Sequence, residues 1–136
     1  MTRSEMREQI FRLLFRIEFH PEEELPEQLV YLADDGDDTE AEAASKRDID
    51  YIQTKAAAVA VLADEIDDRI NAVAKGWKTK RMGKVELAII RLAVYEIEYD
   101  DDIPTGVAIN EAVELAKKYG TEDAPSFVNG ILAKIA

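Results

Sequence analysis

The first sixteen residues combine two kinds of side chain that bind single-stranded nucleic acid. The stretch MTRSEMREQIFRLLFR carries four arginines, which pair with phosphates, and phenylalanines, which stack on bases. At about 100° per residue, Phe11, Phe15 and Phe19 form a stripe beside the apolar face of a predicted helix. We interpret this stripe, with Arg7 one turn before Phe11, as a half-exposed surface for single-stranded RNA. The alternative, that Phe11 only widens the core face, fits the pattern equally well.

Residues suited to catalysis or metal binding are few. The only histidine, His20, precedes a proline, so no histidine metal pair is available and no Ser-His-Asp set has an obvious frame. The chain has no cysteine, which removes disulfides, thiolate chemistry and cysteine zinc sites. The acidic run 34–45 has glycine at its third place, whereas a calcium-binding EF-hand loop needs it at the sixth. We therefore predict a protein that is not an enzyme and uses no metal or cofactor.

The charge of the chain is strongly acidic but unevenly distributed. The formal net charge is −12, and residues 22–50 hold many of the acids. Basic residues gather in 3–16 and in KGWKTKRMGK, residues 75–84. This balance argues against non-specific binding to duplex DNA and favours a local cationic surface on an acidic body. The absence of cysteine and of any apolar run near 18 residues fits a cytoplasmic protein without a membrane span.

The elements that must position these residues are all helical. No segment alternates apolar and polar residues as a strand would, and glycine and proline stand where helices should end. We predict an all-α fold of about seven helices in one domain, 1–136, with an N-terminal part, 1–75, and a C-terminal part, 76–136. The clearest helices are expected at 2–19, 25–33, 47–74, 84–99, 104–119 and from 124 onward. The helix at 84–99 is apolar around most of its circumference, which predicts a central position.

The C-terminal third carries a longer pattern. It contains IIRLAVYE, then IPTGVAINEAVELAKKYG, then EDAPSFVNGIL, and W-x-x-x-RM-x-x-VE precedes them at 77–86. In order and spacing these segments resemble the NusB family of bacterial transcription antitermination factors, and MREQIFRLLF matches the family's first helix more loosely. The resemblance implies an all-helical fold of two small bundles and no catalysis.

The resemblance also implies partners and site residues. Family members bind a short single-stranded RNA element, boxA, together with the ribosomal protein NusE, and help load antitermination complexes on RNA polymerase. Phe15 replaces a family tyrosine in this surface, and Glu86 matches a glutamate that faces NusE. The other positions that match the family's RNA contacts are Arg3, Arg7, Asp123, Phe127 and Asn129.

Three departures from the family weaken the cationic surface. Ser4 and Glu5 stand where arginines are common, and Ser126 stands where a lysine occurs. Each lost phosphate contact lowers RNA affinity and removes roughly one unit from the slope of its salt dependence. Phe15 can stack on a base but lacks the hydroxyl of a tyrosine. Asp123 would be repelled by phosphate, so it would instead cap the last helix or accept hydrogen bonds from base edges.

These departures leave a second interpretation open. The protein would then be a protein–protein scaffold or a homodimer that binds no RNA itself. Within the first helix, we expect Arg3 and Arg7 to face RNA, while Arg12 and Arg16 lie on the polar side and balance nearby acids.

Overall fold

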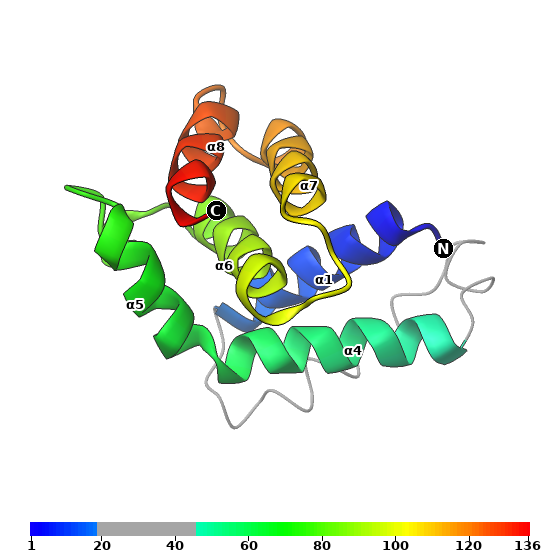
Figure 1. The fold of residues 1–136 in the computed structure, drawn as a ribbon. Coiled ribbons are helices and arrows are strands. Elements are labelled where there is room, and N and C mark those ends of the chain that lie inside the picture. Colours follow the sequence, from blue (N-terminus) through cyan, green and yellow to red (C-terminus); the bar gives the residue numbers. More distant parts are fainter. Residues whose placement is uncertain (19–45) are drawn as a thin grey trace. The chain divides into compact units, whose positions relative to one another are not determined.

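The computed structural model describes residues 1–18 and 46–136, and these residues form helices and connecting turns without a strand (Figure 1). The all-α class predicted from the sequence is confirmed. The expected helix at 25–33, the acidic run 34–45 and His20 lie outside the described residues. The chain divides into two compact units, Met1–Ala60 and Val61–Ala136, which are described in turn.

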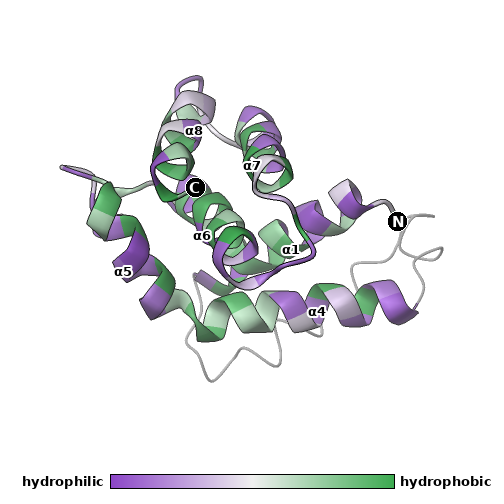
Figure 2. Cartoon of the chain, in the orientation of Figure 1, coloured by the Kyte–Doolittle hydropathy of each residue, from purple (hydrophilic) through white to green (hydrophobic). Residues whose placement is uncertain are grey.

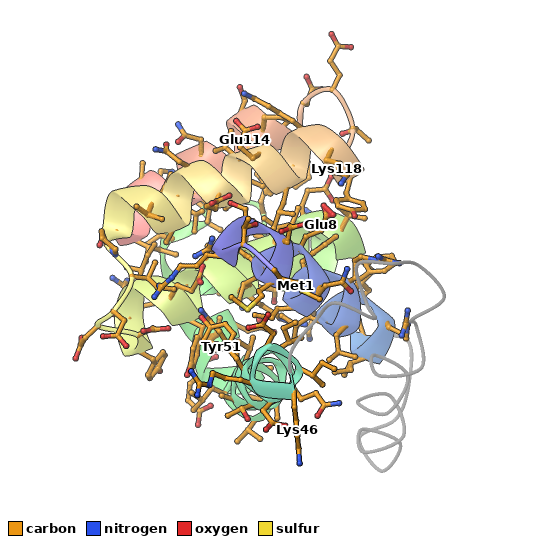
Figure 3. All side chains as sticks on the ribbon, turned by 90° about the vertical axis from the view of Figure 1, so that its right-hand side faces the viewer. Met1, Glu8, Lys46, Tyr51, Glu114 and Lys118 are labelled. Atoms are coloured by element: carbon orange, nitrogen blue, oxygen red, sulfur yellow. The ribbon has the colours of Figure 1, made fainter. Side chains whose placement is uncertain are left out.

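The first unit contains α1, Arg3–Glu18, and most of α4, Lys46–Val61. The side chains of α1 that point inward are Arg7, Ile10, Phe11, Leu13 and Leu14. The N-terminal ammonium group of Met1 pairs with Asp48 Oδ2 at 3.2 Å, which ties the start of α1 to the first turn of α4. Figure 3 labels Met1 together with Lys46 and Tyr51 of α4.

The single long helix expected at 47–74 is two helices, α4 and α5, Ala63–Val73. Leu62 lies between them with φ −94° and ψ 10°, away from helical values. No glycine or proline stands at this position, so the break has no local signal in the sequence. The apolar seam nevertheless continues across it, because Ile52, Val59, Ile66 and Ile70 are all buried.

The second unit is built around α6, Lys84–Tyr99, which has the predicted bounds. It contacts α5, α7, Thr105–Tyr119, and α8, Ala124–Ile135. Its apolar circumference is buried as expected, and Figure 2 shows hydrophobic residues along α6 and hydrophilic ones over much of α5. A short 3₁₀ helix, η2, Thr79–Arg81, precedes α6. The central position predicted for α6 is therefore confirmed.

The helix α5 belongs with the C-terminal helices. It contacts α6 and α8, and Arg91 of α6 donates two hydrogen bonds to Asp67 of α5, from Nε to Oδ1 at 2.8 Å and from NH2 to Oδ2 at 2.6 Å. The compact units therefore divide between residues 60 and 61, whereas the sequence placed the division between 75 and 76. In the described part of the chain, no helix is long and apolar enough to cross a membrane.

The turn between α7 and α8 depends on the small size of Gly120. Its φ of −95° is open to any residue, so the glycine is not needed for a left-handed conformation. A Cβ at this position would lie 2.5 Å from the Cβ of Ala124 and 2.9 Å from the carbonyl oxygen of Ala116. The close approach of the two helices therefore explains the glycine, and it fixes where α8 begins.

Candidate nucleic-acid interface

The predicted RNA-binding residues of the first unit differ in exposure. Arg3 is exposed at the start of α1, while Arg7 is only 6% exposed. Phe11 is 2% exposed, which selects the core interpretation for this residue. Phe15 is half-buried, with its ring centroid 6.2 Å from that of Phe11. In this unit, Arg3 and Phe15 therefore offer RNA more accessible surface than Arg7 does, while Phe19 lies outside the described residues.

The start of α1 explains why an acid stands at position 5. The backbone N–H of Thr2 donates to Glu5 Oε1 at 2.7 Å, and the backbone N–H of Glu5 donates to Thr2 Oγ1 at 3.0 Å. This reciprocal pair is a capping box, which satisfies free N–H groups at a helix start. The hydrogen bonds from Thr2 hold the pKa of Glu5 below its ordinary value. Glu5 thus orders the turn that presents Arg3.

In the second unit, Asp123 and Phe127 share one side of the start of α8. Asp123 is exposed at the position before the helix, and its carbonyl oxygen accepts the N–H of Phe127 at 3.1 Å. Its side chain makes no capping hydrogen bond, so the capping alternative does not apply. Asn129 is exposed but lies about 200° around the helix from Phe127. The structure therefore brings Asp123 and Phe127 together and directs Asn129 to another side of α8.

An aromatic residue that the sequence analysis did not select lies against Phe127. The indole of Trp77 is 57% exposed, and its ring centroid is 6.0 Å from that of Phe127, with an angle of 73° between the rings. Such edge-to-face pairs are favourable contacts. Trp77 lies in segment 75–84, which was selected from the sequence for its positive charge and not for its aromatic ring. The one sequence signal for a binding role of Trp77 was its place among basic residues, a combination typical of sites for single-stranded nucleic acid.

Cationic side chains surround this aromatic pair in the sequence. The exposed basic residues of the segment are Lys75, Lys78, Lys80, Arg81 and Lys84. The ammonium group of Lys78 donates to the carbonyl oxygen of Asn71 at 3.3 Å, which turns this lysine toward α5. The segment thus joins exposed positive charge to an exposed aromatic ring, the combination that single-stranded nucleic acids bind.

Glu86, expected to face a protein partner, lies half-buried in the first turn of α6. Its carboxylate packs over Gly83, directly before the helix, so closely that a side chain on Gly83 would collide with Glu86 Oε2. A Cβ on Gly120 would lie 3.6 Å from Glu86 Oε1. The carboxylate therefore lies between the start of α6 and the turn that leads into α8. A negative charge there also suits the positive end of the helix dipole.

The described residues hold no group of three or more histidine, cysteine, aspartate or glutamate side chains that could bind a metal ion. A shallow hollow between α5 and α6 is lined partly by acids, and there Arg69 Nε donates to Glu98 Oε1 at 2.9 Å. The residues that line this hollow include no nucleophile with an adjacent base. In the described part of the second unit, the exposed aromatic and cationic side chains of segment 75–84 are therefore the stronger candidates for a binding site.

Known proteins resemble this chain over its whole length. The sequence profile of the NusB family matches residues 4–136. The transcription antitermination protein NusB of Agathobacter rectalis is 53% identical over 136 residues, with 100% of each chain covered. Among solved structures, NusB of T. maritima aligns with a TM-score of 0.84 and 33% identity over 100% of this chain and 91% of that one. A chain in a crystal structure described as a plectonemic RNA supercoil aligns with a TM-score of 0.82 and 28% identity, over 98% of this chain and 92% of that one. The chain therefore belongs to the NusB family of transcription antitermination proteins.

Proposed function

We propose that this antitermination protein binds single-stranded boxA-type RNA together with the ribosomal protein NusE, and so assists antitermination complexes on ribosomal RNA operons. The observation that carries the proposal is Phe127, an aromatic ring at the start of α8 beside the basic segment 75–84. Bases of single-stranded RNA can be splayed out and stacked on such rings. One of the similar folds comes from a crystal structure described as an RNA supercoil, which supports RNA as the ligand in general terms.

The site residues take different roles in this proposal. Phe127 stacks on a base, and Phe15 supplies a second aromatic surface in the first unit. Arg3 is exposed and pairs with a phosphate, whereas the buried Arg7 acts chiefly by positioning α1. Asp123 is exposed and without a capping bond, so its carboxylate can accept a hydrogen bond from the amino group of a base.

The remaining two residues complete the assignment. Asn129 faces away from Phe127 on α8, so in the proposal it contacts a neighbouring nucleotide or the partner rather than the same base. Glu86 contributes to NusE binding through the turn that its carboxylate supports between α6 and α8. In this proposal, the complex of the protein with NusE binds the elongating RNA polymerase, and no catalysis is involved.

Fluorescence anisotropy of a labelled boxA-type RNA, titrated with the protein in the presence and absence of NusE, tests this function. Phe127→Ala should weaken RNA binding by roughly 5- to 150-fold, the loss of one stacked base at about 1–3 kcal/mol. Tyr99→Ala is the matched control, because Tyr99 is an exposed aromatic residue of the same unit that stacks on Tyr95 at the far end of α6.

Two results would contradict the proposal. Equal RNA affinity of the Phe127→Ala and Tyr99→Ala variants would remove Phe127 from the site. No RNA binding with or without NusE, combined with a dimer mass in light scattering, would instead support the scaffold or homodimer interpretation.

A further inference from the structure

The side chain of Trp77 is unusual because a large aromatic ring stands in solvent at a defined place. Most of its surface is exposed, yet its ring makes an edge-to-face contact with Phe127, a residue distant in the sequence. A tryptophan needed only for the core would be far more buried. The exposed indole therefore requires a reason other than packing.

The segment that carries Trp77 is held firmly. The backbone N–H of Trp77 donates to the carbonyl oxygen of Ala74 at 3.1 Å, and Gly76 before it adopts φ +82°, the left-handed region that favours glycine. The backbone N–H of Thr79 donates to Asn71 Oδ1 at 2.8 Å, and Asn71 Nδ2 donates to Thr79 Oγ1 at 3.3 Å. These bonds fix both sides of Trp77, so the indole is positioned before any ligand arrives, which lowers the entropic cost of binding.

The angle between the two rings limits what the pair can hold. With 73° between their planes, Trp77 and Phe127 form a corner and not a continuous platform. Two bases that remain stacked on each other cannot lie flat on both rings. A single base that has left its stack can lie with its face on one ring and its edge against the other.

Positive charge at the corner suits the backbone of the same nucleotide. Lys80 and Arg81 are exposed in the 3₁₀ helix that follows Trp77, and neither pairs with an acid of the described residues. Their charges are available for the phosphates on either side of an extruded base, as in other sites for single strands.

We propose that Trp77 is a second base-stacking residue, which forms with Phe127 a corner for one extruded base of single-stranded RNA while Lys80 and Arg81 hold the adjacent phosphates. This inference rests on the proposed RNA-binding function and adds to it a residue, a stoichiometry of one base and a cationic contact.

The intrinsic fluorescence of the protein tests the inference directly, because Trp77 is the only tryptophan in the chain. Titration of the protein and NusE with unlabelled boxA-type RNA, corrected for any tryptophan of NusE with a NusE-only blank, should quench the Trp77 emission in parallel with the anisotropy signal. A base stacked on the indole is expected to cause this quenching.

Three variants separate stacking from structural support. Trp77→Leu keeps an apolar contact with Phe127 but offers no aromatic face, so RNA affinity should fall roughly 5- to 150-fold. Trp77→Phe keeps an aromatic face and should stay within about threefold of the original protein. Tyr99→Ala, at the far end of α6, should leave affinity unchanged, and thermal melts of all variants exclude unfolding as the cause.

An abasic scan of the RNA identifies the base. Replacing each nucleotide in turn by an abasic one should abolish quenching at one position, and at that position the Trp77→Leu variant should lose no further affinity. If boxA-type RNA binds by anisotropy while Trp77 emission and the affinity of Trp77→Leu stay unchanged, the inference is overturned and the proposed function stands. If no RNA binds with NusE present, both are overturned.

Discussion

The replacement of Gly120 by alanine tests whether the α7–α8 turn is set by close approach. The added Cβ would lie 2.5 Å from the Cβ of Ala124 and 2.9 Å from the carbonyl oxygen of Ala116. Ordinary contacts between such atoms lie beyond about 3.4 Å, so the start of α8 must move by close to 1 Å. Because the φ of Gly120 is accessible to alanine, the backbone conformation itself adds no strain.

The expected cost is that of overpacking a tight contact, about 1–3 kcal/mol of unfolding free energy. For a chain of this size each kcal/mol corresponds to a change in Tm of roughly 3–5 °C. Gly120→Ala should therefore lower Tm by about 3–15 °C in thermal denaturation followed by circular dichroism.

Gly130 provides the matched control on α8. It lies inside the helix, and a Cβ there would have no atom within 4 Å. Gly130→Ala should therefore stabilise the protein by about 0.5–1 kcal/mol through helix propensity. A Gly120→Ala protein as stable as the original, or both variants changing stability in the same direction, would refute the close-approach argument.

Three further predictions concern the helix starts and the α5–α6 contact. Because the folded-state pKa of Glu5 is lowered by Thr2, the capping box stabilises α1 above the ordinary glutamate pKa of about 4.3 and loses this effect as pH falls through the lowered value. Glu5→Gln removes the titrating carboxylate and should abolish that acid-dependent fraying of α1 in amide hydrogen exchange, and unchanged fraying would count against the capping box. Asp67→Asn should destabilise the second unit by about 1–3 kcal/mol, because it breaks a half-buried bidentate pair with Arg91, and a double-mutant cycle in urea measures the coupling. Glu86→Gln should cost about 0.3–1 kcal/mol at the start of α6 and weaken NusE binding in calorimetry, whereas intact NusE affinity would remove Glu86 from the partner surface.

The helices that the sequence predicted well are those with strong local boundaries. The bounds of α6 and the start of α8 followed from apolar periodicity and from flanking turn residues, and both are confirmed. The end of α7 at residue 119 was also predicted, and Gly120 directly after it serves close packing and not a left-handed conformation. The break at Leu62 had no such local signal. The helices on its two sides, α4 and α5, belong mostly to different compact units, which is a property of the fold and not of the local sequence.

The site was predicted unevenly for a similar reason. Family resemblance selected Phe127 and Asp123, which the structure places on one side of α8. The contact of Trp77 with Phe127 joins segments distant in the sequence, so neither periodicity nor spacing could reveal it. The role of Glu5 was likewise hidden, since an acid at an expected arginine position looked like a loss until its capping bonds were seen.

Membership of the NusB family confirms the predicted all-α fold, the predicted role in transcription antitermination and the expectation that the protein is not an enzyme. The contacts with RNA and NusE remain proposals. Their physical basis is a local cationic and aromatic surface on a chain whose net charge is −12. An acidic body of this kind repels nucleic acid except where such a surface is exposed.

The most direct test of the central claim compares two RNAs of equal composition. The protein and NusE are titrated against labelled boxA-type RNA and against the same nucleotides in scrambled order, at several salt concentrations. We predict tighter binding of the boxA-type sequence, a salt dependence of roughly 0.7 unit for each phosphate contacted, and loss of the preference in Phe127→Ala. Equal affinity for the two RNAs, or a preference that survives Phe127→Ala, would contradict it.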